Sequence, residues 1–140
     1  MKIMICGSMT FAKEMMDAKK KLEGLGHSIF VPSDIESHIK EPSLIDNLEK
    51  NSKHAIEKDV LRNCFNLIAR SDGILVLNYP KNKIDGYVGA SSLMEIGLAY
   101  YLGKKIFFLN PISSSRGARW AHEIKIIQPA VINGDIELIR

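Results

Sequence analysis

A polar, glycine-containing loop separates two apolar runs of this chain and leads into a helix, and this arrangement limits the folds that the chain can adopt. The first apolar run covers residues 73–79, the loop and helix cover 80–102, and the second run covers 105–110. We interpret this order as strand, loop, helix and strand, which forms a right-handed crossover between parallel strands. The loop then lies at the carboxyl end of a strand, where open α/β sheets bind ligands.

The rest of the chain repeats the alternation of strands and helices. Apolar runs that fit buried parallel strands are residues 2–6, 27–31, 73–79, 105–109 and 130–133. Helical patterns cover residues 9–25, 54–70, 92–102 and 119–127. This alternation predicts an α/β fold in which helices cover both faces of a parallel sheet. Five strands favour a flavodoxin-like arrangement with strand order 2-1-3-4-5.

That strand order brings two loops from distant parts of the sequence to one crevice. The Gly7-Ser8 loop follows the first strand, and the Gly86 to Glu95 loop follows the third. The switch point of the sheet lies between these two strands. Residues 33–53 are highly charged and contain a proline, which predicts a loop with a short helix. Both a lid over the crevice and a loosely packed excursion fit this segment.

Length and composition limit the class of protein. A chain of 140 residues suits one domain over residues 1–140. No apolar run approaches the roughly 20 residues of a membrane span, and the first residues do not fit a signal peptide. The net charge is +3 and the basic residues are scattered, so we expect no nucleic-acid partner. Cys6 and Cys64 form no disulfide framework, which favours a cytoplasmic location.

Glu95 has two interpretations. In the first, Ser92 caps the helix and Glu95 reaches back to it in a capping box. In the second, Glu95 lies in the first helical turn, is kept ionised by the helix dipole, and attacks or stabilises an electron-poor sugar carbon. The small residues Gly89 to Ser91 before it leave space for a ligand. Gly97 after it predicts a close contact between helix and sheet.

Other candidates surround the same crevice. Gly7 and Ser8 predict an anion site at a helix start, or a plain turn in which Ser8 is the N-cap. Asp59 is a candidate acid/base or orienting group, with Asn63 as its alternative, although a solvated helix charge also explains Asp59. Tyr87 offers a ring that can stack on a base.

Some motifs point elsewhere or are absent. The loop from Ser113 to Arg116 follows the fourth strand and is a further candidate for a phosphate contact. Asp72 precedes the third strand at the opposite end of the sheet, so we interpret it as a turn residue. The chain has no Walker or Rossmann glycine motif, and no histidine, cysteine and carboxylate set has metal-ligand spacing. We therefore expect neither a metal nor another cofactor.

Four segments together resemble the nucleoside 2-deoxyribosyltransferase superfamily. They are Cys6-Gly7-Ser8, residues 71–77, the run Ser92-Leu93-Met94-Glu95-Ile96-Gly97-Leu98-Ala99, and Gly103-Lys104-Lys105-Ile106. The resemblance implies a flavodoxin-like fold and identifies Glu95 as the counterpart of a nucleophile that forms a glycosyl-enzyme intermediate at C1′. It also implies a homodimer or larger homo-oligomer, because neighbouring subunits often complete the site in that family.

Within that resemblance, the sequence favours one branch. Transferases acting on free nucleosides carry an acidic residue where this chain has Gly89. The related deoxynucleoside 5′-monophosphate glycosidases have serine and glycine in this loop and bind phosphate. Ser91 and Ser92, with Ser8 across the crevice, favour that branch. Asp59 matches the family's helix aspartate only if a gap is allowed.

The sequence therefore predicts an enzyme that cleaves or transfers at the N-glycosidic bond of a (2′-deoxy)nucleoside or its 5′-monophosphate. The predicted catalytic residues are Glu95 and Asp59, and the predicted substrate-binding residues are Gly7, Ser8, Asn63, Tyr87, Gly89, Ser91 and Ser92. One alternative is a phosphoribohydrolase with a Gly-Gly-x-Gly-Thr-x-x-Glu loop, which this chain matches loosely. The other is a non-catalytic nucleotide-binding module in which Glu95 only caps a helix.

Overall fold

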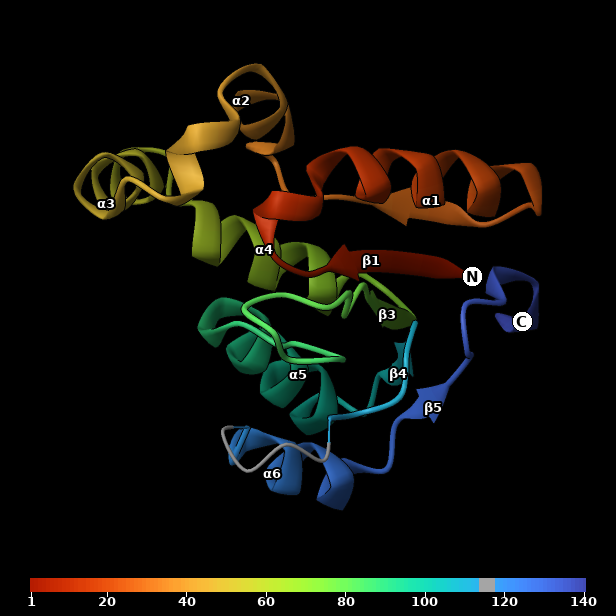
Figure 1. The fold of residues 1–140 in the computed structure, drawn as a ribbon. Coiled ribbons are helices and arrows are strands. Elements are labelled where there is room, and N and C mark those ends of the chain that lie inside the picture. The colour runs from red at the N-terminus through yellow and green to blue at the C-terminus, as the bar shows by residue number, and fades with distance from the viewer. Residues whose placement is uncertain (114–117) are drawn as a thin grey trace.

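The computed structural model describes residues 1–113 and 118–140 as an α/β fold (Figure 1). All strand pairs are parallel, and the strand order is β2-β1-β3-β4-β5. The strands are β1 (Lys2–Cys6), β2 (Ser28–Phe30), β3 (Gly73–Val76), β4 (Lys105–Phe108) and β5 (Ala130–Val131). The predicted fold class and strand order are confirmed. Cys6 pairs with Val76, so the chain leaves β1 and β3 at the same level of the sheet.

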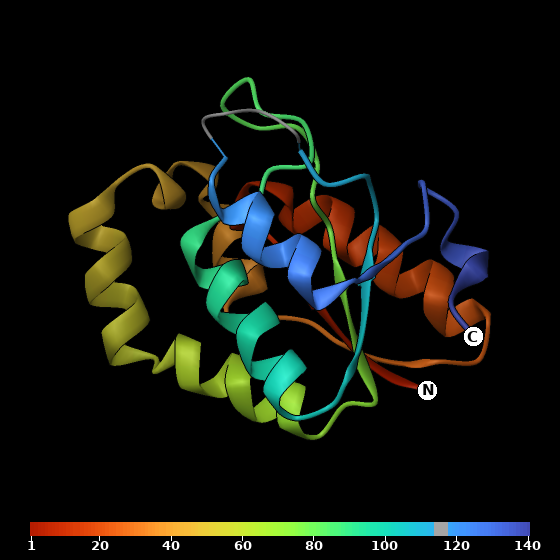
Figure 2. The ribbon, with the colours of Figure 1, turned by 90° about the horizontal axis from the view of Figure 1, so that it is seen from below.

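Helices cover both faces of the sheet (Figures 1 and 2). They are α1 (Ala12–Gly24), α2 (Ile35–Lys40), α3 (Leu48–Glu57), α4 (Val60–Ala69), α5 (Ala90–Tyr101) and α6 (Trp120–Ile127), with short 3₁₀ helices at Met9–Phe11, Pro42–Ile45 and Ile136–Leu138. In the part of the chain that the structure describes, no helix combines the length and apolar character required to cross a membrane.

The two faces of the sheet form two separate hydrophobic clusters. Ile3 and Ile5 of β1 belong to the cluster that includes α1, and the alternate residues Met4 and Cys6 belong to the cluster that includes α4, α5 and α6. Successive side chains of a strand point to opposite faces, so a strand covered on both sides must be apolar throughout. This requirement explains why the strands were recognisable as continuous apolar runs.

The segment between β2 and β3 differs from the prediction. Residues 33–53 contain α2, a 3₁₀ helix and most of α3, and α2 and α3 lie beyond the carboxyl end of β1 (Figure 1). The single helix predicted for residues 54–70 is wrong, because α3 ends at Glu57 and α4 begins at Val60. Asp59 separates the two helices with φ 48° and ψ 44°, in the left-handed region, where an α-helix cannot continue.

Helix α5 begins earlier than predicted. Gly89 is its N-cap, and the Leu93 N–H donates to the Gly89 carbonyl over 2.9 Å. Ser92 is therefore the third helical residue and Glu95 lies in the second turn, so the capping-box interpretation and the first-turn placement are both wrong. The predicted cap at Gly103 is confirmed: its φ is 68°, and the Lys104 N–H donates to the Ala99 carbonyl over 2.9 Å.

The loop between β3 and α5 is fixed against the segment that follows β4. Asn78 is fully buried, accepts the Asn110 N–H at 2.8 Å and donates its amide to the Asn110 carbonyl at 2.8 Å. Gly86 approaches this segment so closely that a Cβ would lie 2.3 Å from the Pro111 carbonyl oxygen, and its φ is 67°. These contacts hold the loop that leads to Glu95 in one position.

Gly97 does not make the predicted close contact with the sheet. It lies on the exposed side of α5, where a Cβ would meet nothing within 4 Å. Replacing Gly97 with Ala is therefore expected to raise the free energy of unfolding by about 0.5–1 kcal/mol, since alanine loses less conformational entropy in a helix. Urea denaturation measures this gain, and Gly86→Ala is the control that should destabilise. An unchanged or lowered stability of Gly97→Ala contradicts this placement.

Candidate active site

A cleft of about 470 Å³ lies at the carboxyl ends of β1 and β3. Its size falls in the range of roughly 300–1,000 Å³ that is usual for small-molecule sites. Its walls come from the loop after β1, the segment from Pro32 to Cys64, and the start of α5. The predicted site residues that line it are Gly7, Ser8, Tyr87, Gly89, Ser91, Ser92 and Glu95. The two predicted loops therefore do meet at one cleft.

Glu95 is a buried carboxyl group at this cleft, with 6% of its surface exposed. Burial raises the pKa of Glu95 to about 7, a hydrogen bond from the Cys6 thiol lowers it in part, and the negative charge of Asp34 raises it further. Burial thus outweighs the helix dipole that was expected to keep the group ionised. Among the described residues, Oε2 of Glu95 has no hydrogen-bond partner. The carboxyl group ionises near neutral pH, and one of its oxygens is buried without a hydrogen-bond partner in the described part of the chain.

The two cysteines near Glu95 remain thiols at neutral pH. Burial raises the pKa of Cys64 to about 12, and the charges of Glu95 and Asp34 raise it further. Burial also raises the pKa of Cys6 well above its usual value, with a further contribution from Glu95. The thiolate is the nucleophilic form of cysteine, so neither residue is suited to attack a substrate.

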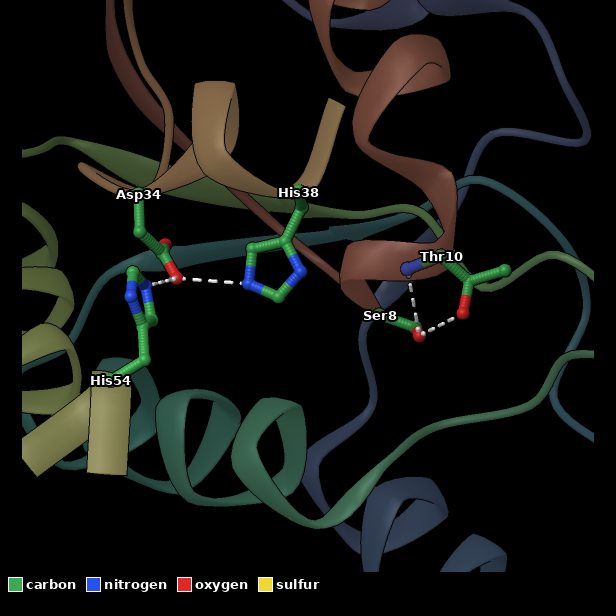
Figure 3. Close-up of polar contacts among 5 residues, drawn as sticks. All are labelled: Ser8, Thr10, Asp34, His38 and His54. Atoms are coloured by element: carbon green, nitrogen blue, oxygen red, sulfur yellow. Dashed lines mark hydrogen bonds and ion pairs between the residues drawn. The ribbon is translucent and has the colours of Figure 1, made fainter. Parts of the chain in front are cut away.

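One end of the cleft is polar and carries a positive charge. The Lys81 ammonium donates to Ser8 Oγ at 3.0 Å and lies 5.7 Å from the centre of the Tyr87 ring. Ser8 is also the N-cap of the 3₁₀ helix before α1, because its Oγ accepts the Thr10 N–H at 3.3 Å (Figure 3). Lys81 was missed from the sequence because only the folded loop brings it to Ser8.

Asp59 and Asn63 do not reach the cleft. Asp59 lies in the break between α3 and α4, where its side chain is 61% exposed and pairs with Arg62 at 3.1 Å. The Asn63 side chain donates to the Lys58 carbonyl at 3.0 Å. Both positions were predicted on the assumption of one continuous helix. Cys64, rather than Asn63, lines the cleft together with Glu95.

Asp34 is the carboxylate that the structure brings to the cleft instead. It is buried at the start of α2 and accepts hydrogen bonds from His38 and His54 (Figure 3). Asp34 and His38 line the cleft, and His54 lies on α3. The sequence of this segment predicts a loop with a short helix and shows no metal-ligand spacing. The one available signal was the four-residue separation of Asp34 and His38, which suits one face of a helix.

The predicted phosphate contact after β4 falls mostly on residues 114–116, which lie outside the described part of the chain. Ser113, the first residue of that prediction, is buried.

The chain is distantly similar to a solved structure. No protein-family model and no curated protein sequence matches this chain. A solved structure of CMP N-glycosidase BcmB from Clostridium botulinum aligns with 98% of this chain and 93% of its own, at 16% identity and a TM-score of 0.49.

Proposed function

We propose that this chain cleaves the N-glycosidic bond of a (2′-deoxy)nucleoside 5′-monophosphate, with Glu95 as the nucleophile. The observation that carries the proposal is the state of Glu95. It is a buried carboxyl group of pKa about 7 at a cleft of about 470 Å³, and its Oε2 has no hydrogen-bond partner among the described residues. A group that titrates close to the working pH of an enzyme, inside a cleft, marks a candidate catalytic residue. The resemblance of the Glu95 helix to the deoxyribosyltransferase nucleophile supports the same role.

The proposed reaction has two displacement steps. A Glu95 oxygen attacks C1′ of the sugar, and the bond between C1′ and the base nitrogen breaks with its electron pair leaving on the base, which takes up a proton from solvent. Water then attacks C1′ of the resulting sugar ester, loses a proton, and releases the Glu95 carboxylate. The products are the free base and the sugar 5′-phosphate, with the configuration at C1′ retained.

The charged end of the cleft supports a 5′-monophosphate rather than a free nucleoside. Lys81 and Ser8 offer an ammonium and a hydroxyl at 3.0 Å from each other, and a phosphate can accept from both. Ser91 and Ser92 also line the cleft and come shortly before Glu95 in the sequence. We propose that they contact the sugar. Tyr87 remains the proposed stacking partner of the base.

Glu95 does not act as a helix cap, which weakens the non-catalytic alternative. The N-cap of α5 is Gly89, and Glu95 makes no capping contact from the second turn. Asp59, which lies outside the cleft, has no part in the mechanism proposed here. Asp34 is instead the second carboxylate near Glu95, and its negative charge raises the pKa of Glu95.

Chromatographic product analysis tests this function. The purified protein is incubated with nucleosides and 5′-monophosphates, in ribose and deoxyribose forms, with and without a second free base. We expect free base to be released from monophosphates. A new nucleotide formed only with the acceptor base would instead identify a transferase. Nucleotide binding without any product across the whole panel would contradict the proposed catalysis.

Lys81 provides a sharper test of the phosphate end. Replacing Lys81 with Met is expected to raise KM for the monophosphate roughly 10- to 100-fold, because a charge-assisted hydrogen bond contributes about 1.5–3 kcal/mol. Any turnover of the free nucleoside should stay unchanged. Lys83→Met is the matched control, since Lys83 is an exposed lysine of the same loop outside this cleft. Equal effects on monophosphate and nucleoside would argue against a phosphate role for Lys81.

A further inference from the structure

Asp34, His38 and His54 form a compact group of three potential metal ligands, which we call the Asp-His-His cluster. The Nε2 atom of His38 lies 3.0 Å from Asp34 Oδ2, and the Nε2 atom of His54 lies 3.2 Å from the same oxygen. All three ligand atoms lie within 4.8 Å of one another. Figure 3 shows the carboxylate of Asp34 between the two imidazole rings, which come from α2 and α3.

The hydrogen bonds in this cluster are distributed unevenly. Both imidazoles converge on Oδ2 of Asp34, whereas Oδ1 of the same buried carboxylate has no partner among the described residues. Nδ1 of His38 is also buried and has no partner among the described residues, and only 4% of His38 is exposed. A buried polar network normally satisfies its atoms, because each unpaired buried group costs about 1–3 kcal/mol. The hydrogen bonds therefore leave this buried network incompletely satisfied, while one ligand atom from each of the three residues lies within 4.8 Å of the other two.

We propose that Asp34, His38 and His54 bind one divalent cation of the Zn²⁺ class. Two imidazole nitrogens and one carboxylate oxygen suit zinc and neighbouring first-row metals, whereas Mg²⁺ and Ca²⁺ require mostly oxygen ligands. The two nitrogen-to-oxygen distances, 3.0 Å and 3.2 Å, are also close to the edge of a tetrahedron around zinc, whose bonds to nitrogen and oxygen are about 2.0–2.2 Å. Each ring binds the metal as the neutral imidazole, with Nε2 on the metal and the ring proton on Nδ1.

The Asp-His-His cluster borders the cleft. Asp34 and His38 both line the cleft that contains Glu95. Zinc sites that act on ligands use three protein groups and keep the fourth position for water or substrate, whereas purely structural sites fill all four positions with protein. The structure thus fits a site whose fourth ligand is a water or a ligand oxygen in the cleft. This inference does not depend on the N-glycosidase function and can hold if that function is wrong.

Zinc binding by the full-length chain tests the proposal. Metal-free protein is mixed with Zn²⁺ and a chromophoric chelator, and competition gives the number of ions bound per chain and their affinity. We expect one ion per chain, and at least a 100-fold lower affinity in His54→Ala. His122→Ala is the matched control, because His122 is an exposed histidine on α6, outside the cluster, and should bind zinc like the unmodified chain.

A second readout keeps the test independent of any effect on folding. Zinc should raise the melting temperature of the unmodified chain and of His122→Ala but not that of His54→Ala, because only a ligand that binds the folded state stabilises it. If circular dichroism shows His54→Ala to be unfolded, Asp34→Asn replaces it, since the amide keeps the shape and removes the charge. No zinc binding, or equal affinity in a folded cluster variant and in His122→Ala, would overturn the proposal.

Discussion

Replacing Glu95 with Gln is expected to lower kcat on the order of 10⁴-fold or more, as loss of a catalytic nucleophile commonly does. The amide has nearly the same shape as the carboxyl group, yet it cannot form the proposed ester with C1′. Glu95 is buried and Oε2 is unpartnered among the described residues, so the substitution breaks no hydrogen bond at that atom. Nucleotide affinity should therefore change little while turnover is lost.

The measurement combines initial rates with equilibrium binding of the monophosphate that is turned over fastest. Glu123→Gln is the matched control, because Glu123 is an exposed glutamate on α6 that is not part of the cleft lining, and its removal should leave kcat unchanged. A Glu95→Gln protein that keeps more than about a tenth of the activity, at unchanged stability, would mean that Glu95 is not the nucleophile.

Activity and stability are expected to change with pH in opposite directions. The pKa of Glu95 is about 7 in the folded chain, against an ordinary value of 4.5. Between these values the folded chain binds more protons than the unfolded chain, so its free energy of unfolding falls as pH rises. The stabilising contribution of the protonated carboxyl is fully present below pH 4.5 and is lost as pH passes through about 7. Nucleophilic attack needs the ionised form, so turnover rises over the same interval.

Urea denaturation from pH 4 to pH 8, run in parallel on the unmodified chain and Glu95→Gln, isolates this contribution. Glutamine does not titrate, so the difference between the two free energies of unfolding removes the effect of all other groups. We expect Glu95→Gln to gain about 3 kcal/mol relative to the unmodified chain over this range. A constant difference between the two proteins would show that Glu95 has an ordinary pKa, and a kcat that does not rise towards pH 7 would separate Glu95 from catalysis.

The strands were predictable from local apolar patterns, and their order in the sheet was predictable from general rules of chain topology. Each central strand is buried on both faces, which requires an uninterrupted apolar run such as Ile74 to Leu77. Right-handed crossovers then restrict the possible topologies. Helix α3 was hidden because none of its residues is buried, so the pattern of apolar residues carries little information there. The break at Asp59 has no glycine or proline to signal it.

The same reasoning explains which parts of the site were found. Ser8 and Tyr87 lie in the loops after β1 and β3, and Glu95 lies in the second turn of the helix that follows β3. The rule that ligands bind at the carboxyl ends of strands places all three at one site. Asp34 and Lys81 belong to segments without a clear pattern, and their positions depend on how α2, α3 and the loop after β3 pack. The pKa of Glu95 depends on its burial and on Cys6 and Asp34, which are distant in the sequence, so a sequence motif does not encode it.

Trapping the covalent intermediate tests the role of Glu95 most directly. A 2′-fluoro nucleoside 5′-monophosphate is suited to this, because the electron-withdrawing fluorine slows breakdown of the sugar ester by destabilising its oxocarbenium-like transition state. The reaction is quenched in acid, and the protein and its peptides are analysed by mass spectrometry. We expect one added sugar phosphate on the peptide that contains Glu95, and none on Glu95→Gln. Release of free base with no adduct on Glu95, or with an adduct on another residue, would contradict this role of Glu95.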